Sequence, residues 1–229
     1  MGINPRGLVP ALVHDGNVII ESNDILEYLE HKFPEPALIP NDQADRLHAM
    51  LKQEDDLHLD IRALTMRFVF PSFLTKRPEK EIAAYETLGS GTVGGDVDPH
   101  RDVEAQFWRD MNTHGKITDA QAKRAFDRFA AVLGSFDEAL THSTYMVGAN
   151  VSLVDIAWYI YARRLLSAGY HLHTRQPAVG AWFDRLHRNP DFREEVPDGG
   201  VPGLITSLLH LTQKLSGTTL EKVAARTDS

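Results

Sequence analysis

Two short motifs near the start of the sequence combine residue types that could hold a small polar ligand. Glu21-Ser22 follows the apolar run Asn17–Ile20 and precedes residues spaced as in a helix. A helix N-terminus has unpaired N–H groups and a partial positive charge, both of which favour a bound carboxylate. The Ser22 hydroxyl would add a donor, and the Glu21 carboxylate could accept from an ammonium group. The pair therefore suits the α-carboxylate and α-amine of an amino acid, while the simpler interpretation is an ordinary helix cap at Ser22.

The second motif is Val9-Pro10, within the apolar run from Leu8 to His14. A proline lacks the N–H that a sheet ladder needs, so one interpretation is a proline at a sheet edge. The other is a cis peptide bond that presents the backbone of Val9 to a ligand, because cis X–Pro bonds are uncommon and need a reason. The motif alone leaves both interpretations open.

Patterning predicts the elements that would position these motifs. Two short apolar runs joined by Asp15-Gly16 predict a β-hairpin. Residues from Ser22 to Phe33 have helical spacing, and from Asp42 onward the pattern is helical almost to the end of the chain. The predicted helices are a long one over about 43–70, one from about 101, and others over about 119–141, 152–170, 177–187 and 203–224. The fold class is therefore mostly α with a small β-hairpin: an α+β segment over 1–36 and an all-helical domain over 42–224.

The composition of the sequence argues against several classes of function. The formal net charge of −8 argues against a nucleic-acid partner. The sequence has no cysteine, which excludes disulfides, cysteine-ligated zinc and a cysteine nucleophile within this chain. No apolar window has the length of a bilayer span, and the first residues do not have the layout of a signal peptide. We therefore expect a cytoplasmic protein with no membrane partner.

Three further features have simpler explanations than a ligand site. The string Gly89-x-Gly91-x-x-Gly94 neither follows a predicted strand nor opens an apolar helix, so a loop is favoured over a nucleotide site. His171-x-His173 lacks a neighbouring carboxylate or cysteine, so a solvated loop is favoured over a metal site. Glu54 lies on the apolar stripe of the long predicted helix, either at its margin or lining a pocket or an intersubunit cleft. We expect no metal.

The combined pattern resembles the glutathione S-transferase family. The segment from Asn4 to Leu12, then Asp15-Gly16, then Ile20-Glu21-Ser22 follow one another at the spacing found in the second half of that family's thioredoxin-like domain. A second match is the box from Gly148 to Asp155, in which Ser152 and Asp155 form a capping box at the start of the most apolar helix. The segment 4–12, with the long stretch from Phe70 to Gly115, looks like bacterial transferases that cleave lignin β-aryl ethers.

The resemblance implies a role for each matching residue. Glutathione would be the co-substrate, with Glu21 and Ser22 holding its γ-glutamyl end. Pro10 would be the cis proline, and the backbone of Val9 would pair with the cysteinyl part of glutathione. The helical domain would shape a pocket for a hydrophobic electrophile, and homodimers are usual in the family.

The sequence departs from the family pattern at the thiol-activating residue. In the family this tyrosine, serine or cysteine lies near the first strand and helix, and that strand, helix and second strand would precede Asn4. No catalytic residue can be assigned within this sequence. The leading hypothesis is a glutathione transferase that conjugates or reductively cleaves an electrophile, and the alternative is a non-catalytic scaffold or interaction module built on the helical domain.

Overall fold

The computed structural model describes residues 9–71, 75–87, 92–93, 96–97, 100–194 and 200–226. The chain forms two compact units, each made of two segments. One unit comprises Met1–Pro36 and Thr75–Lys116, and the other comprises Ala37–Leu74 and Ile117–Ser229. The sequence-based division into 1–36 and 42–224 stays a prediction.

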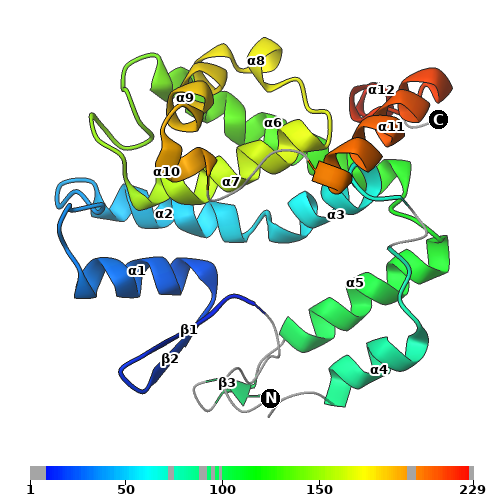
Figure 1. The fold of residues 1–229 in the computed structure, drawn as a ribbon, viewed down its shortest axis with the longest axis horizontal. Coiled ribbons are helices and arrows are strands. Elements are labelled where there is room, and N and C mark those ends of the chain that lie inside the picture. Colours follow the sequence, from blue (N-terminus) through cyan, green and yellow to red (C-terminus); the bar gives the residue numbers. More distant parts are fainter. Residues whose placement is uncertain are drawn as a thin grey trace. The chain divides into compact units, whose positions relative to one another are not determined.

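The first unit begins with the predicted hairpin. Strands β1 (Ala11–His14) and β2 (Asn17–Ile20) are antiparallel, with Ala11 opposite Ile20 (Figure 1). The turn residues Asp15 and Gly16 have φ values of 49° and 79°. Positive φ at both central residues suits the right-handed twist of a two-residue hairpin, and Asp-Gly tolerates it well. The hairpin prediction is confirmed.

Helix α1 (Ser22–Lys32) packs against both strands of this hairpin. His14 connects the two layers, because its Nδ1 lies 2.9 Å from the hydroxyl of Tyr28. The His14 ring also meets the rings of Tyr28 and Phe33 edge-on, at centroid distances of 5.8 and 5.7 Å. These contacts fix the angle at which α1 leaves the hairpin.

The other segment of the first unit is a helical hairpin. Helix α4 (Glu79–Thr87), which the pattern did not predict, packs against α5 (His100–His114), and Figure 1 shows the two side by side. The Asn112 side-chain amide donates to the carbonyl of Arg77 at 2.6 Å, and the Arg77 guanidinium lies 4.5 Å from the centroid of the Trp108 ring. Two short strands, β3 (Thr92–Val93) and β4 (Asp96–Val97), pair between the helices.

The second unit is all-helical in the part of the chain that the structure describes. Its helices, in chain order, are α2 (Ala44–Asp55), α3 (His58–Phe68), α6 (Asp119–Leu140), α7 (Leu153–Ser167), α8 (Leu172–Arg175), α9 (Pro177–His187), α10 (Pro190–Arg193), α11 (Gly200–Ser216) and α12 (Leu220–Ala224). The predicted fold class is confirmed, and α9 has the predicted bounds.

Helix α7 lies at the centre of this unit, packed against α2, α3, α8 and α9. Trp158 is almost fully buried, donates from Nε1 to the carbonyl of Met50 at 3.1 Å, and meets the Phe136 ring edge-on at 4.7 Å. Burying such a large aromatic side chain, with its one polar atom paired, contributes strongly to stability.

The N-terminus of α7 depends on the predicted capping box. The Asp155 carboxylate is fully buried and accepts from the N–H and the hydroxyl of Ser152 at 2.9 and 2.7 Å. It also accepts from the N–H of Met146 at 3.0 Å and from Nε1 of Trp182, on α9, at 2.7 Å. Asp155 therefore joins the start of α7 to the preceding loop and to α9.

The prediction of one continuous helix over 43–70 is wrong, because the helix breaks between α2 and α3. The N–H of Leu57 bonds to the carbonyl of Glu54 at 3.0 Å, three residues back, so the chain tightens into a turn at this point. Leu57 is 2% exposed. The apolar period continues through the break, which is why the pattern indicates one helix.

The predicted helix over 203–224 is also two helices. The chain leaves α11 at Gly217, which has φ 65°, and the N–H of Thr218 bonds to the carbonyl of Gln213 at 2.9 Å. This left-handed ending requires a residue such as glycine. Thr219 then caps α12 by accepting from the N–H of Lys222 at 3.4 Å.

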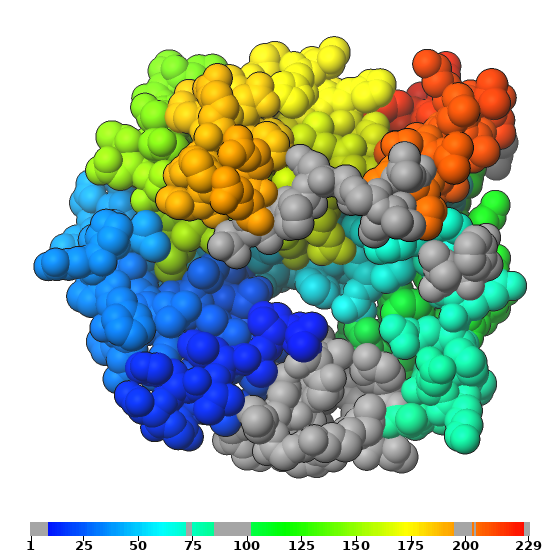
Figure 2. Space-filling view, viewed as in Figure 1, coloured from blue at the N-terminus to red at the C-terminus, as the bar shows by residue number. Residues whose placement is uncertain are grey.

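Helix α11 donates side-chain hydrogen bonds to the end of α3. Gln213 Nε2 donates to the carbonyl of Phe68 at 3.3 Å, and the hydroxyl of Thr206 donates to the carbonyl of Val69 at 3.4 Å. The opposite face is apolar and exposed, and Figure 2 shows the orange and red side chains of α11 and α12 at the surface. The exposed apolar residues of this face are Ile205, Leu208, Leu211 and Leu215. Within the described residues, no helix is both long and apolar enough to cross a membrane.

Candidate functional site

The candidate ligand site in the first unit lies where β2 turns into α1. Strand β2 ends at Ile20, and Glu21 adopts a left-handed backbone conformation with φ 70° before α1 begins at Ser22. The N–H of Ile25 makes the first helical bond, to the carbonyl of Glu21 at 3.0 Å. The backbone N–H groups of residues 22–24 come before that bond, in the part of a helix where N–H groups have no intrahelical acceptor.

The prediction that Ser22 caps this helix is wrong. Glu21 occupies the N-cap position and makes no side-chain capping hydrogen bond, and Ser22 is the first helical residue, with an exposed side chain. The left-handed φ of Glu21 turns the chain sharply at the end of the strand, so the helix starts one residue later than a Ser22 cap would place it. The Ser22 hydroxyl is therefore not committed to capping.

Val9 and Pro10 come directly before β1, and the peptide bond between them is cis. Both residues are exposed, Val9 to 92%. The hairpin register places Ala11 opposite Ile20. The residue before Ala11 and the residue after Ile20 are Pro10 and Glu21, so all four sequence-predicted residues lie at one end of the hairpin.

This end of the hairpin combines several groups whose chemistry suits an amino-acid-like ligand. The helix N-terminus and the Ser22 hydroxyl supply donors for a carboxylate, and Glu21 supplies a carboxylate that can accept from an ammonium group. Asp24, in the first turn of α1, adds a second negative charge at this terminus. A ligand with both charges, rather than a simple anion, fits this set of groups best.

A second group of ionisable residues lies inside the helical unit. Glu54, at the end of α2, is 6% exposed, and the hydroxyl of Tyr161, on α7, donates to its carboxylate. Burial raises the pKa of Tyr161, and the charge of Glu54 and its hydrogen bond raise it further. Glu54 is therefore buried and belongs to a polar cluster, rather than lying at the margin of the apolar stripe.

Arg164 belongs to the same cluster and was not singled out as a site residue in the sequence. Its Nε donates to the hydroxyl oxygen of Thr65, on α3, at 3.3 Å. Burial lowers the pKa of Arg164, and although Tyr161 opposes that shift, the nearby charge of Arg62 adds to it. The signal that could have found this residue is an arginine in the middle of the most apolar helix of the sequence.

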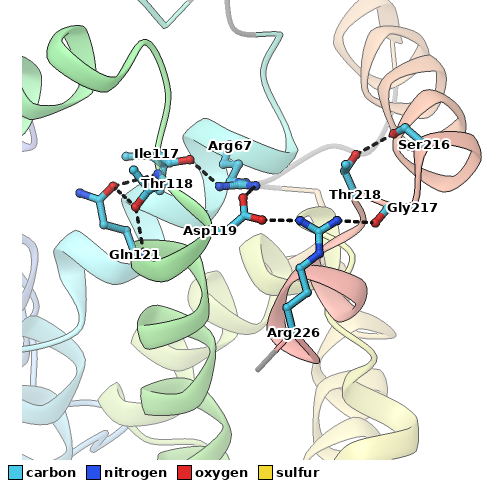
Figure 3. A network of polar contacts seen from close by, with 9 residues as sticks. All are labelled: Arg67, Ile117, Thr118, Asp119, Gln121, Ser216, Gly217, Thr218 and Arg226. Carbon is cyan, nitrogen blue, oxygen red and sulfur yellow. Dashed lines mark hydrogen bonds and ion pairs between the residues drawn. The ribbon is translucent and has the colours of Figure 1, made fainter. Parts of the chain in front are cut away.

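In a third polar network, the charged side chains form ion pairs and hydrogen bonds with one another. Asp119, the first residue of α6, accepts from Arg67 on α3 and from Arg226 beyond α12, as Figure 3 shows. The guanidinium of Arg67 also donates to the carbonyl of Ile117, and that of Arg226 donates to the carbonyl of Gly217 at 3.2 Å. Thr118 and Gln121 complete a capping box at the same terminus. We assign this network to holding α3, α6 and the α11–α12 turn together.

The remaining sequence features do not gather into a site in the described part of the chain. His173 Nε2 lies 3.0 Å from Asp184, while His171 Nδ1 lies 3.8 Å from Glu221. No cluster of three metal-ligating side chains occurs among the described residues. The glycines of Gly89-x-Gly91-x-x-Gly94 lie outside the described residues.

Comparison with known proteins agrees with these features. Residues 2–37 match the family model described as glutathione S-transferase, N-terminal domain, and residues 104–190 match the model described as glutathione S-transferase, C-terminal domain. Together the two models cover more than half of the chain. The chain belongs to the glutathione S-transferase family.

Among the relatives, Protein LigF of Sphingobium sp. is 26% identical over 202 residues, which are 84% of this chain and 74% of LigF. The crystal structure of LigF, described as a beta-etherase, superposes with a TM-score of 0.66 and covers 84% of this chain and 79% of that one. Glutathione S-transferase L1 of Arabidopsis thaliana is 43% identical over 193 residues, covering 81% of this chain but 59% of the plant protein. Maleylacetoacetate isomerase of Pseudomonas aeruginosa is 47% identical over 47 residues, which are 22% of that enzyme. The matches to the last two proteins thus span less than two thirds of their lengths.

Proposed function

We propose that this protein binds glutathione at the end of the hairpin and transfers it to an electrophilic small molecule. The γ-glutamyl carboxylate would accept from the N-terminus of α1 and from the Ser22 hydroxyl, and the γ-glutamyl ammonium would donate to Glu21. The backbone of Val9, held by the Val9–Pro10 bond, would pair with the cysteinyl part. The observation that carries this proposal is the register that puts Pro10 and Glu21 at the same end of the hairpin.

The proposed reaction is nucleophilic substitution by the glutathione thiolate. A carbon–sulfur bond forms at the electrophilic carbon, and the bond to the leaving group breaks with its electron pair. For an aryl ether the leaving group is a phenolate, which takes up a proton from water. Similarity to LigF, whose crystal structure is described as that of a beta-etherase, supports a hydrophobic aryl ether as the electrophile. The family resemblance supports a cytoplasmic homodimer.

Calorimetric titration of glutathione tests the binding half of the proposal. We expect Ser22→Ala and Glu21→Gln each to weaken binding about tenfold or more, because each removes a hydrogen bond to a charged group. Ser135→Ala, an exposed serine on α6, is the matched control and should leave the dissociation constant unchanged. Equal affinity in all four proteins, or no binding to the wild type, would refute the assignment.

An activity assay tests the transfer step separately. Wild-type protein with glutathione and an aryl ether should release the phenol and form the thioether in equal amounts. Binding of glutathione without phenol release would favour the non-catalytic alternative for this chain.

A further inference from the structure

Helix α11 turns most of its described leucines away from α3 and into solvent. Toward α3 it presents polar side chains, because Gln213 is 8% exposed and both Gln213 and Thr206 donate to carbonyls at the end of α3. On its other side, Leu208, Leu211 and Leu215 are 64%, 54% and 81% exposed. A surface helix of a globular protein normally turns its apolar stripe to the core. The orientation of α11 therefore leaves an apolar face in contact with water.

The spacing of the apolar residues on this face is that of two helices packed together. Intervals of three and four residues alternate along the series Val201, Leu204, Leu208, Leu211 and Leu215. An apolar repeat of 3.5 residues forms the seam between paired helices, whereas a helix on a globular core has a wider stripe. We call the exposed part of this face the leucine seam, which consists of Ile205, Leu208, Leu211 and Leu215.

The charges on α11 favour an identical helix as the partner. Lys214 is the one lysine, arginine, aspartate or glutamate in Gly200–Ser216, so the helix has no charge pattern that would select an oppositely charged protein. The net charge of −8 opposes an anionic membrane surface. In an antiparallel pair about a two-fold axis, each seam meets the same seam of the other copy. That arrangement places the two Lys214 side chains at opposite ends, whereas a parallel pair would bring them to the same level.

We propose that the leucine seam of α11 is a surface through which two copies of this chain associate, with their α11 helices antiparallel. The 17 residues of α11 span about 25 Å. A standard interface buries about 800 Å² on each partner, which is more than four aliphatic side chains present, so the association is weak, with a micromolar dissociation constant. It does not depend on the proposed glutathione site, whose residues lie in the other unit.

Sedimentation equilibrium over a series from micromolar to millimolar protein tests the surface. The average mass of the wild type should double across the series. Leu211→Gln and Leu215→Gln should each raise the midpoint concentration about tenfold or more, because each removes two leucines from the pair. Val103→Gln changes another exposed aliphatic residue, on α5, and should leave the midpoint unchanged.

Two results of this experiment would overturn the proposal. The first is a wild-type mass that stays constant across the series, which would leave the seam to a different partner or to none. The second is a midpoint that the leucine substitutions leave unchanged, or that Val103→Gln raises equally. Since Leu211 and Leu215 are exposed, their substitution should leave the circular dichroism spectrum unchanged, so a raised midpoint does not report misfolding.

Disulfide cross-linking tests the antiparallel geometry, because the sequence has no cysteine of its own. Leu211→Cys lies close to the middle of the seam and should form a covalent dimer on mild oxidation. Leu215→Cys should not, since its two copies would lie at opposite ends, but the double variant Ile205→Cys/Leu215→Cys should cross-link. Val103→Cys measures random collision. Cross-linking of Leu211→Cys at the level of Val103→Cys would overturn the surface, and equal cross-linking of Leu215→Cys and Leu211→Cys would overturn the antiparallel arrangement.

Discussion

Asp155 shows how much of the helical unit depends on one carboxylate. Its two oxygens accept from four donors, two of them on Ser152 and the others on Met146 and Trp182. The residue is fully buried, so water cannot replace a lost acceptor. Removing the carboxylate would leave buried donors without partners, which costs more than the hydrogen bonds contributed.

We therefore expect Asp155→Ala to lower the free energy of unfolding by about 3–5 kcal/mol. The control is Asp137→Ala. Asp137 is half-buried and accepts from the N–H groups of Ala178 and Val179 at the start of α9, at 2.7 and 3.0 Å, so it acts as a cap from another helix. Its loss should cost about 1 kcal/mol, as for an ordinary cap. Urea denaturation followed by circular dichroism measures both, and equal losses would contradict the role of Asp155.

Asp119 carries a pH-dependent part of the stability. The hydrogen bond from Arg67 lowers its pKa most, partial burial opposes the shift, and Arg226 adds to the lowering. A carboxyl whose folded-state pKa is below its unfolded value stabilises the fold above the unfolded pKa, about 4, and loses that contribution as pH falls through the folded pKa. Asp119 should thus contribute at neutral pH and lose its contribution in acid.

Urea denaturation at about pH 6 and about pH 3 checks this expectation. The wild type should be more stable than Asp119→Asn at the higher pH, and the difference should shrink at the lower pH. In the Arg67→Gln background the same substitution should have a smaller effect, because the main cause of the lowered pKa is gone. A difference that stays constant with pH would show that the ionisation of Asp119 does not carry its contribution to stability.

At the scale of the helices, the same Gly→Ala substitution should have opposite effects on stability at two positions. Gly134 lies in α6, and a Cβ added there meets nothing within 4 Å. Gly180 lies in α9, and a Cβ there would come 2.9 Å from the His173 ring and 3.0 Å from its Cα. Gly134→Ala should stabilise the protein by about 0.5–1 kcal/mol through helix propensity. Gly180→Ala should destabilise it by about 1–3 kcal/mol, because the backbone of α8 must move.

Thermal unfolding of the two variants beside the wild type measures this contrast. Both substitutions add the same methyl group to a helical residue, so helix propensity alone predicts that both stabilise. Stabilisation by Gly180→Ala would show that α8 can shift away from α9 at little cost. Destabilisation by Gly134→Ala would show that the surface of α6 is covered.

How far the sequence predicts these elements depends on how local their causes are. The hairpin follows from Asp15-Gly16 and the start of α9 from Pro177, because a turn or a helix start is encoded by a few adjacent residues. The breaks at Leu57 and Gly217 were missed, since the apolar period continues across both. The roles expected for Val9, Pro10, Glu21 and Ser22 came from the family resemblance. The hydrogen bond between Arg164 and Thr65, in contrast, joins residues 99 positions apart, and no local pattern predicts such a contact.

At the scale of the whole molecule, the proposed glutathione site falls in one of the two units. The hairpin residues belong to the unit that contains Met1–Pro36, whereas α6 belongs to the unit that contains Ala37–Leu74 and Ile117–Ser229. A ligand that binds only the folded state stabilises the segment that holds it, by about 2.7 kcal/mol at one hundred times its dissociation constant. Local unfolding reports where that stabilisation acts.

Hydrogen exchange measured by mass spectrometry should therefore locate bound glutathione along the chain. Saturating glutathione should slow exchange in residues 11–32, where β1, β2 and α1 lie, and leave α6 unchanged. Protection by glutathione in α3 and α7 without any in residues 11–32 would place its binding in the helical unit and contradict the role of Glu21 and Ser22.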